Sequence, residues 1–127
     1  MATGPWIPNI VEPHYEDILT KQLALNRQTW AALQQPGVRE ESRLGLDFSY
    51  NAPSREAAEK LRFLLQKETD YDVKVESSGS FLHRRWRVEG TTQETAVSPA
   101  ILDQWVTWMV TAGQERACDF DGWGTAI

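Results

Sequence analysis

The sequence predicts a single α+β domain in which one antiparallel sheet carries two helices on one face. Three observations lead to this fold class. The chain has 127 residues, the size of one domain. Apolar residues alternate with period two in several short segments and recur at three- and four-residue spacings in others, as in strands and amphipathic helices. From Leu44 onward the order is strand, helix, strand, strand, helix, strand, which is typical of the ferredoxin-like βαββαβ arrangement.

Two segments precede this unit. Three prolines within residues 1–13 fix φ and remove backbone donors, so this stretch is predicted to be an extended arm. Its apolar side chains, Trp6 among them, need cover, and we expect the arm to lie against the domain. Residues 14–37 are predicted to form an added helix that a Pro-Gly pair ends. Asn26 in its apolar seam is compatible with packing inside the chain or across a homodimer, and packing inside the chain is the expectation.

The ferredoxin-like unit is predicted to occupy residues 43–127 and to begin with a strand. Its apolar residues alternate with polar ones and share one face: Leu44, Leu46, Phe48 and Tyr50. Ser54 is then placed to cap a helix whose apolar stripe ends near Thr69. A second strand follows, with three apolar residues on one face: Tyr71, Val73 and Val75.

The second half of the ferredoxin-like unit is predicted to repeat the order strand, helix, strand. After a Ser-Gly turn, residues 81–91 are predicted to form a third strand with three inward residues: Leu82, Trp86 and Val88. Ser98 supplies a cap, and Pro99 the first position, of a helix that ends between residues 113 and 116. Residues 117–120 are expected to form a short last strand, after which the chain leaves regular structure.

Composition limits the class of protein. The 18 acidic and 13 basic side chains give a net charge of −5, which weakens the case for a broadly basic nucleic-acid-binding surface. One cysteine excludes an internal disulfide, and one cysteine with two distant histidines does not match a structural zinc site. The apolar runs are far shorter than the roughly 20 residues that span a bilayer, and the N-terminus lacks a secretory pattern, so a cytoplasmic protein is expected.

The sequence offers no recognisable catalytic set. His14 and His83 are far apart and in no triad or metal-ligand spacing. Cys118 lies beside Asp119, whose carboxylate opposes thiolate formation, so a quiet buried thiol is expected. We therefore expect no catalytic, cofactor-binding or metal-binding residues. A third reading, an enzyme, would need several ionisable residues to converge in a pocket: Asp47, Asp119, Asp121 and His83.

A basic stretch carries an alternative function, RNA binding. Arg85 and Arg87 share one face of the expected strand. Phe81 and His83 lie on the same face, and arginines with aromatic residues can pair phosphates and stack bases. Trp86 points to the other side, so the ordinary interpretation of this stretch is a solvated cationic face with Trp86 in the core.

The end of the chain holds the sharpest motif. It consists of four residues: Asp121, Gly122, Trp123 and Gly124. Its aspartate can hydrogen-bond its own turn, and its glycines permit positive φ on either side of the tryptophan. Trp123 and Trp6 lie outside the expected helices and strands, and such residues either clasp their own domain or anchor a partner. The four motif residues and Trp6 are therefore the candidate protein-interaction residues.

This motif, followed by Thr125, resembles the C-terminal signature of the regulator of ribonuclease E activity B family. Residues 54–58, which open a helix after the first strand, are also similar to that family. The resemblance covers residues 44–127. It implies a ferredoxin-like domain without catalytic residues that acts by binding a protein. In characterised members this partner is ribonuclease E, whose endonuclease activity is restrained.

Two departures from the family pattern bear on the partner. The arm and the helix with Trp30 replace the N-terminal region that the family leads us to expect, and no strongly acidic tail follows Gly124. The leading prediction is a non-catalytic bacterial interaction module, a monomer or homodimer without a cofactor, that regulates a ribonuclease by direct binding.

Overall fold

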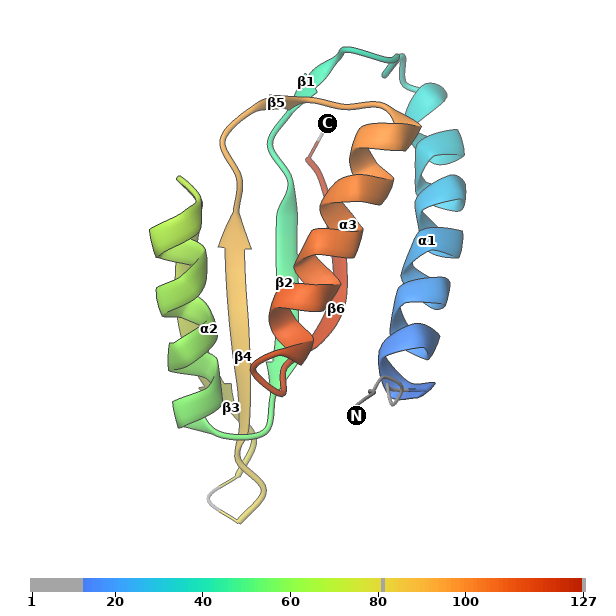
Figure 1. Ribbon diagram of the computed structural model, residues 1–127. Helices are drawn as coiled ribbons and strands as arrows, with labels where there is room; N and C mark the ends of the chain where they lie inside the picture. The colour runs from blue at the N-terminus through green and yellow to red at the C-terminus, as the bar shows by residue number, and fades with distance from the viewer. Residues whose placement is uncertain (1–12, 81, 127) are drawn as a thin grey trace, which may run out of the picture.

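The computed structural model describes residues 13–80 and 82–126, and this part of the chain has three helices and two antiparallel sheets (Figure 1). The helices are α1 (Pro13–Gln34), α2 (Arg55–Glu68) and α3 (Pro99–Gln114). The larger sheet has the order β3-β4-β2-β6 and contains β2 (Asp47–Ala52), β3 (Asp72–Ser78), β4 (Arg85–Thr91) and β6 (Asp119–Gly124). A separate sheet pairs β1 (Arg43–Leu44) with β5 (Thr95–Ala96). Most of the expected arm, including Trp6, lies outside the described residues.

The helices lie on one face of the four-stranded sheet, and the other face is left open (Figure 1). Helix α2 packs over β3 and β4, and α3 packs against β6. Helix α1 packs along α3 inside the same chain, which confirms the expected packing of this added helix. Two polar contacts fix it there. The Tyr15 hydroxyl lies 3.0 Å from Thr111 Oγ1, and Asn26 Nδ2 donates to Asp103 Oδ1 at 3.0 Å.

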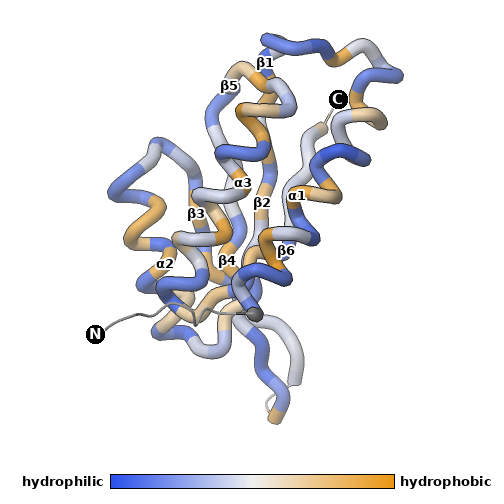
Figure 2. Tube along the Cα trace, turned by 45° about the vertical axis from the view of Figure 1, so that its right-hand side comes forward, coloured by the Kyte–Doolittle hydropathy of each residue, from blue (hydrophilic) through white to orange (hydrophobic). Residues whose placement is uncertain are grey.

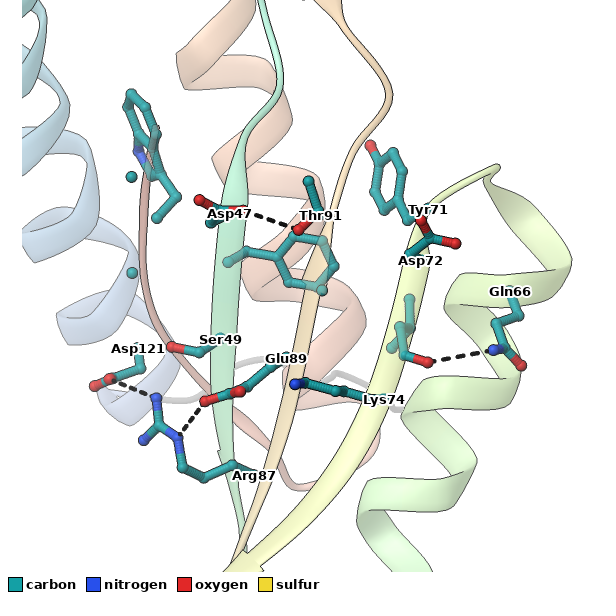
Figure 3. A pocket seen from close by; sticks show the side chains of 16 residues that line it. Asp47, Ser49, Gln66, Tyr71, Asp72, Lys74, Arg87, Glu89, Thr91 and Asp121 are labelled. Atoms are coloured by element: carbon teal, nitrogen blue, oxygen red, sulfur yellow. Dashed lines mark hydrogen bonds and ion pairs between the residues drawn. The ribbon is translucent and has the colours of Figure 1, made fainter. Parts of the chain in front are cut away.

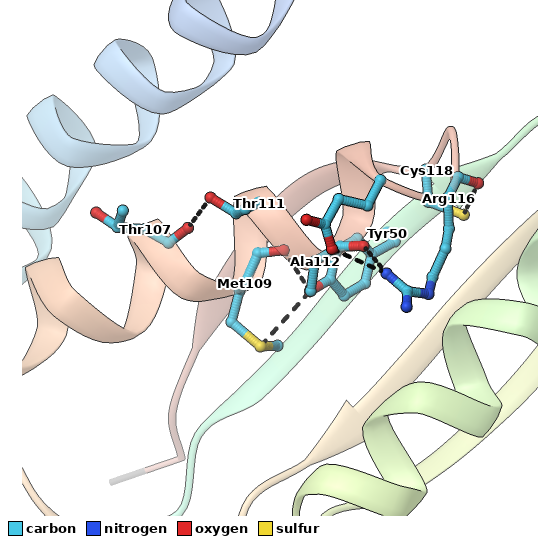
Figure 4. A network of polar contacts seen from close by, with 8 residues as sticks. Tyr50, Thr107, Met109, Thr111, Ala112, Arg116 and Cys118 are labelled. Carbon is cyan, nitrogen blue, oxygen red and sulfur yellow. Dashed lines mark hydrogen bonds and ion pairs between the residues drawn. The ribbon is translucent and has the colours of Figure 1, made fainter.

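The main core lies between the sheet and the helices. Its buried residues are Phe48, Tyr50, Ala58, Leu61, Leu65, Val88, Val106, Met109, Val110, Ala112, Cys118 and Phe120. Tyr50 is central, because its ring packs edge-to-face on Phe120 at 5.2 Å and its hydroxyl donates to the Met109 carbonyl at 2.8 Å (Figure 4). Burial raises the pKa of Tyr50 well above its usual value, so this buried donor stays protonated at neutral pH.

Local signals in the sequence place two helix starts correctly. The Ser54 hydroxyl accepts from the Ala57 N–H at 3.1 Å, and the Ser98 hydroxyl accepts from the Ile101 N–H at 3.1 Å. The apolar stripes of α2 and α3 face the sheet, and hydrophobic residues recur along both helices in Figure 2. The prediction that Trp30, Trp86 and Trp105 pack in the core is confirmed, since all three lie against its buried residues.

The first predicted strand is in fact two. Leu44 belongs to β1, while Phe48 and Tyr50 belong to β2 in the other sheet. Between them the Thr92 N–H donates to the Leu46 carbonyl at 2.9 Å, but the Leu46 N–H donates to Thr92 Oγ1 at 3.0 Å, so a side chain takes the place of one backbone acceptor at this point. Leu46 packs in a second, smaller core cluster instead: Leu33, Val38, Leu46, Val97 and Leu102.

Two predicted strand limits are also wrong. Strand β4 begins at Arg85, and Leu82 is 81% exposed rather than inward, because His83 N–H bonds to Ser80 close a turn here. Phe81 lies outside the described residues. At the other end, β6 continues to Gly124, so Trp123 lies in a strand and not beyond regular structure. A bulge opposite Ser49 lets β6 absorb the extra residue and keep pairing with β2.

Candidate functional site

The open face of the four-stranded sheet is polar and hollowed (Figure 3). Strand alternation puts the apolar side chains of β2 and β4 under the helices and the polar ones on this face. The depression is lined by all four strands, with Gln66 and Tyr71 at its β3 end. Its ionisable side chains are Asp47, Asp72, Lys74, Arg87, Glu89 and Asp121, together with Tyr71.

The strand register arranges this face in rows. In one row Asp72 pairs with Thr91, Thr91 with Asp47, and Asp47 with Gly124. The Thr91 hydroxyl donates to Asp47 Oδ1 at 2.8 Å, as Figure 3 shows. Within the described part of the chain, neither Asp47 nor Asp72 has an ion pair. The row therefore presents two carboxylates with no counter-charge.

Arg87 ties the centre of the face together. Its Nε lies 3.2 Å from Glu89 Oε2, and its Nη2 lies 3.5 Å from Asp121 Oδ2. Its Nη1 donates to Asn51 Oδ1 at 2.9 Å. The contact with Asn51 joins β4 to β2, and the contact with Asp121 joins β4 to β6, the strand beyond β2. All three nitrogens of the guanidinium group have a partner.

Lys74, the other cation of the depression, is also paired. Its Nζ lies 3.0 Å from Glu76 Oε2 on the same strand. The hydrogen bond between them raises the pKa of Lys74 and lowers the pKa of Glu76, so both groups are charged at neutral pH.

The C-terminal motif lies at the β6 edge of the depression. Asp121 points onto the open face toward Arg87 (Figure 3). Gly122 has φ +143°, the positive value that suits glycine in a bulge. Trp123 is directed back toward the helices, where its Nε1 donates to Asn26 Oδ1 at 2.8 Å. Its ring packs edge-to-face on Trp105 at 6.2 Å. The tryptophan thus joins β6 to α1 and α3.

The segment from the middle of α1 to Thr125 matches a known family. The match spans residues 23–125, and the family is described as regulator of ribonuclease activity B. The chain belongs to this family. Its members are regulators of ribonuclease activity, which confirms the resemblance seen in the sequence. A comparison with curated proteins gives no match. The matched range includes both Asn26 and Trp123, so their hydrogen bond lies within the family's region.

In this member of the ribonuclease regulator family, three of the four residues of the RNA-binding alternative are described, and two of them, Arg85 and Arg87, lie two positions apart on β4. Arg87 is held by two carboxylates, and Arg85 is exposed at the start of β4. His83 is exposed in the turn before that strand. Phe81 lies outside the described residues. RNA binding through these residues remains a prediction, and the contacts of Arg87 do not favour it.

The four residues of the enzyme alternative are also only partly brought together. Asp47 and Asp121 line the depression, but Asp119 Oδ1 lies 3.0 Å from His14 Nε2 and accepts from Gln114 Nε2 at 2.8 Å.

Among residues 13–80 and 82–126 no group of three or more histidine, cysteine, aspartate or glutamate side chains could hold a metal ion. None of the helices described is long and apolar enough to cross a membrane.

Cys118 is buried, and burial together with the Asp119 carboxylate raises its pKa to about 11. We predict that the folded protein reacts with an aromatic disulfide reagent at mildly alkaline pH at least about 100-fold more slowly than the unfolded chain, because little thiolate forms. The absorbance of the released thiolate measures the rate, and Cys118→Ser gives the blank. Equal rates in the folded and unfolded protein would contradict the burial of this thiol.

Sequence reasoning singled out the β6 side of the depression and missed the β3 side. Asp72, Lys74 and Glu89 were predicted to lie in strands but not to share a surface with Asp121. Period-two alternation does give their outward direction. The register that puts them beside Asp47 and Arg87 depends on pairing between distant strands and leaves no local signal.

Proposed function

We propose that this chain regulates a ribonuclease of the ribonuclease E type by binding it directly, without catalysing a reaction itself. We place the binding surface on the open face of the sheet. One observation carries this proposal. All four residues of the motif that resembles the family signature line the depression on that face: Asp121, Gly122, Trp123 and Gly124. Membership of a family of ribonuclease regulators supports a ribonuclease as the partner.

The division of labour inside the motif follows from its contacts. Asp121 and the two glycines are accessible from the open face, whereas Trp123 is held by Asn26 on the helical side. We therefore assign direct contact to Asp121, Gly122 and Gly124, and to Trp123 the shaping of the β6 edge. Trp6, outside the described residues, remains a candidate contact.

We also propose a fold type and domain limits for this chain. The strand order β3-β4-β2-β6 and the two βαβ halves support a ferredoxin-like unit, with β1 and β5 as additions. The packing of α1 on α3 supports one domain over residues 14–127. We expect the protein to act in the cytoplasm, and one copy of the chain is enough for the proposed contact.

A bulky substitution at the centre of the face tests the proposal. Ser49 lines the depression, and Ser49→Trp is expected to weaken binding to purified ribonuclease E at least about 10-fold while leaving the core untouched. The control is Gln28→Trp on the exposed side of α1. Binding is measured by calorimetry, and inhibition by the cleavage rate of a fluorogenic single-stranded RNA.

The outcomes separate the parts of the proposal. If the wild type neither binds ribonuclease E nor slows its cleavage, the proposed function is wrong. If folded Ser49→Trp binds as tightly as Gln28→Trp, the function stands but the surface is wrong. Salt-dependent binding of the chain to the RNA alone would favour the RNA-binding alternative.

A further inference from the structure

We propose that the open face binds a cationic, extended segment of the protein partner, and that Asp47 and Asp72 receive its basic side chains. This inference rests on the proposed function, because it names the chemistry of the partner segment that the same face would hold. It is carried by the charge of the face, the spacing of the two carboxylates and the free space beside them.

The charge of the face is negative where a partner would meet it. Its depression is lined by four carboxylates and two cationic groups, which leaves a net charge of −2. Both cations are already paired, Arg87 with Glu89 and Asp121, and Lys74 with Glu76. A phosphate backbone would therefore meet uncompensated carboxylates, and a lysine- or arginine-rich segment would meet complementary charge.

The two unpaired carboxylates are spaced for an extended chain. Asp47 and Asp72 lie on β2 and β3 with Thr91 of β4 between them, so about 10 Å separates their backbones. In an extended segment, side chains at positions i and i+2 point to the same side about 7 Å apart. The long, flexible stems of lysine and arginine cover the remaining distance. One segment lying across the strands can thus reach both carboxylates.

The β6 end of the same row leaves room for the backbone of such a segment. Gly124 pairs with Asp47, and a Cβ added at Gly124 or at Gly122 would have no atom within 4 Å. The row therefore opens onto bare backbone at the β6 edge. A partner segment that crosses the row next to Asp47 therefore meets no side chain at Gly124.

The test uses the full chain and a short fluorescent peptide in which arginine and serine alternate. A second peptide carries citrulline in place of arginine, which removes the charge and keeps the shape. Fluorescence anisotropy gives the affinity at low and at physiological salt. We expect the arginine peptide to bind, with an affinity that falls as salt rises, and the citrulline peptide not to bind.

Two matched double variants locate the binding. Asp47→Asn with Asp72→Asn removes two charges from the face, and Glu16→Gln with Asp17→Asn removes two from the exposed side of α1. Both change the net charge equally. The face variant is expected to bind the arginine peptide at least about 10-fold more weakly than the α1 variant. Equal loss in both variants, or binding of the citrulline peptide, would overturn the inference.

The same variants separate this inference from the proposed function. If the face double variant still binds and inhibits purified ribonuclease E while Ser49→Trp does not, the function stands and the cationic segment is wrong. If the wild type binds the arginine peptide through this face but does not bind ribonuclease E, the chemistry of the face stands and the proposed function is wrong. Binding of the wild type to labelled single-stranded RNA in place of the peptide would overturn the cationic segment.

Discussion

Trp123→Ala is expected to lower the free energy of unfolding by about 3 kcal/mol. The half-buried ring packs on Trp105, and its loss leaves a gap between β6 and α3. The substitution also removes the N–H that bonds Asn26 Oδ1, and Asn26 is only 3% exposed, so its amide oxygen would be left buried and unpaired. Urea unfolding followed by circular dichroism measures the change.

A conservative variant separates the two causes. Trp123→Phe keeps most of the ring contact and removes only the donor, so a loss of about 1 to 2 kcal/mol is expected. Trp108→Phe is the control, because Trp108 is 42% exposed and that replacement should change stability by less than about 0.5 kcal/mol. If both phenylalanine variants cost the same, the bond to Asn26 does not contribute to stability.

This result decides how Trp123 can be used as a functional probe. A variant that destabilises the fold by about 3 kcal/mol and leaves a gap beside β6 can weaken partner binding for reasons unrelated to direct contact. Capture of a partner by wild type and by Trp123→Ala therefore cannot show whether the tryptophan touches that partner. Ser49 is a sharper probe, because its side chain lies on the open face, opposite the buried rings of its neighbours Phe48 and Tyr50.

The sequence predicts best those features that depend on neighbours along the chain. Ser54 and Ser98 cap helices through bonds to residues three positions ahead, and these caps are readable from local sequence. The split between β1 and β2 is not readable, because it depends on Thr92, which bonds the Leu46 N–H from 46 positions away. The prediction that Leu82 points inward is wrong for a related reason. Its apolar character predicts burial, but the turn closed by the His83 N–H leaves its side chain in solvent.

The candidate site divides in the same way. The motif at the end of the chain is contiguous, and its glycines and tryptophan can be recognised in the sequence. Its partners are not contiguous, since Trp123 bonds Asn26 from 97 positions away and Asp121 meets Arg87 across the sheet. The local sequence also suggests that the Arg87 side chain is free to bind a partner. Only the fold shows that this side chain is paired with the carboxylates of Glu89 and Asp121.

Gly113→Ala is expected to destabilise the protein by about 2 kcal/mol, although a glycine inside a helix is usually improved by alanine by up to about 1 kcal/mol. A Cβ at Gly113 would lie 2.6 Å from Tyr50 Cε2 and 2.7 Å from the Cys118 carbonyl oxygen. Neither neighbour can move away easily. The Tyr50 ring is fully buried and its hydroxyl is bonded to Met109 at 2.8 Å, and the Cys118 oxygen is backbone (Figure 4).

Whether Gly113→Ala lowers or raises the free energy of unfolding tests the packing of α3 on β2. Urea unfolding of Gly113→Ala is compared with that of Gly45→Ala, whose added Cβ would lie 3.6 Å from the Thr92 carbonyl oxygen, an ordinary contact. Gly45→Ala is expected to leave stability unchanged or to raise it by up to about 1 kcal/mol, because alanine restricts the unfolded chain. If Gly113→Ala were also more stable than the wild type, helix propensity would outweigh the contact. The end of α3 would then lie farther from Tyr50 than these distances require.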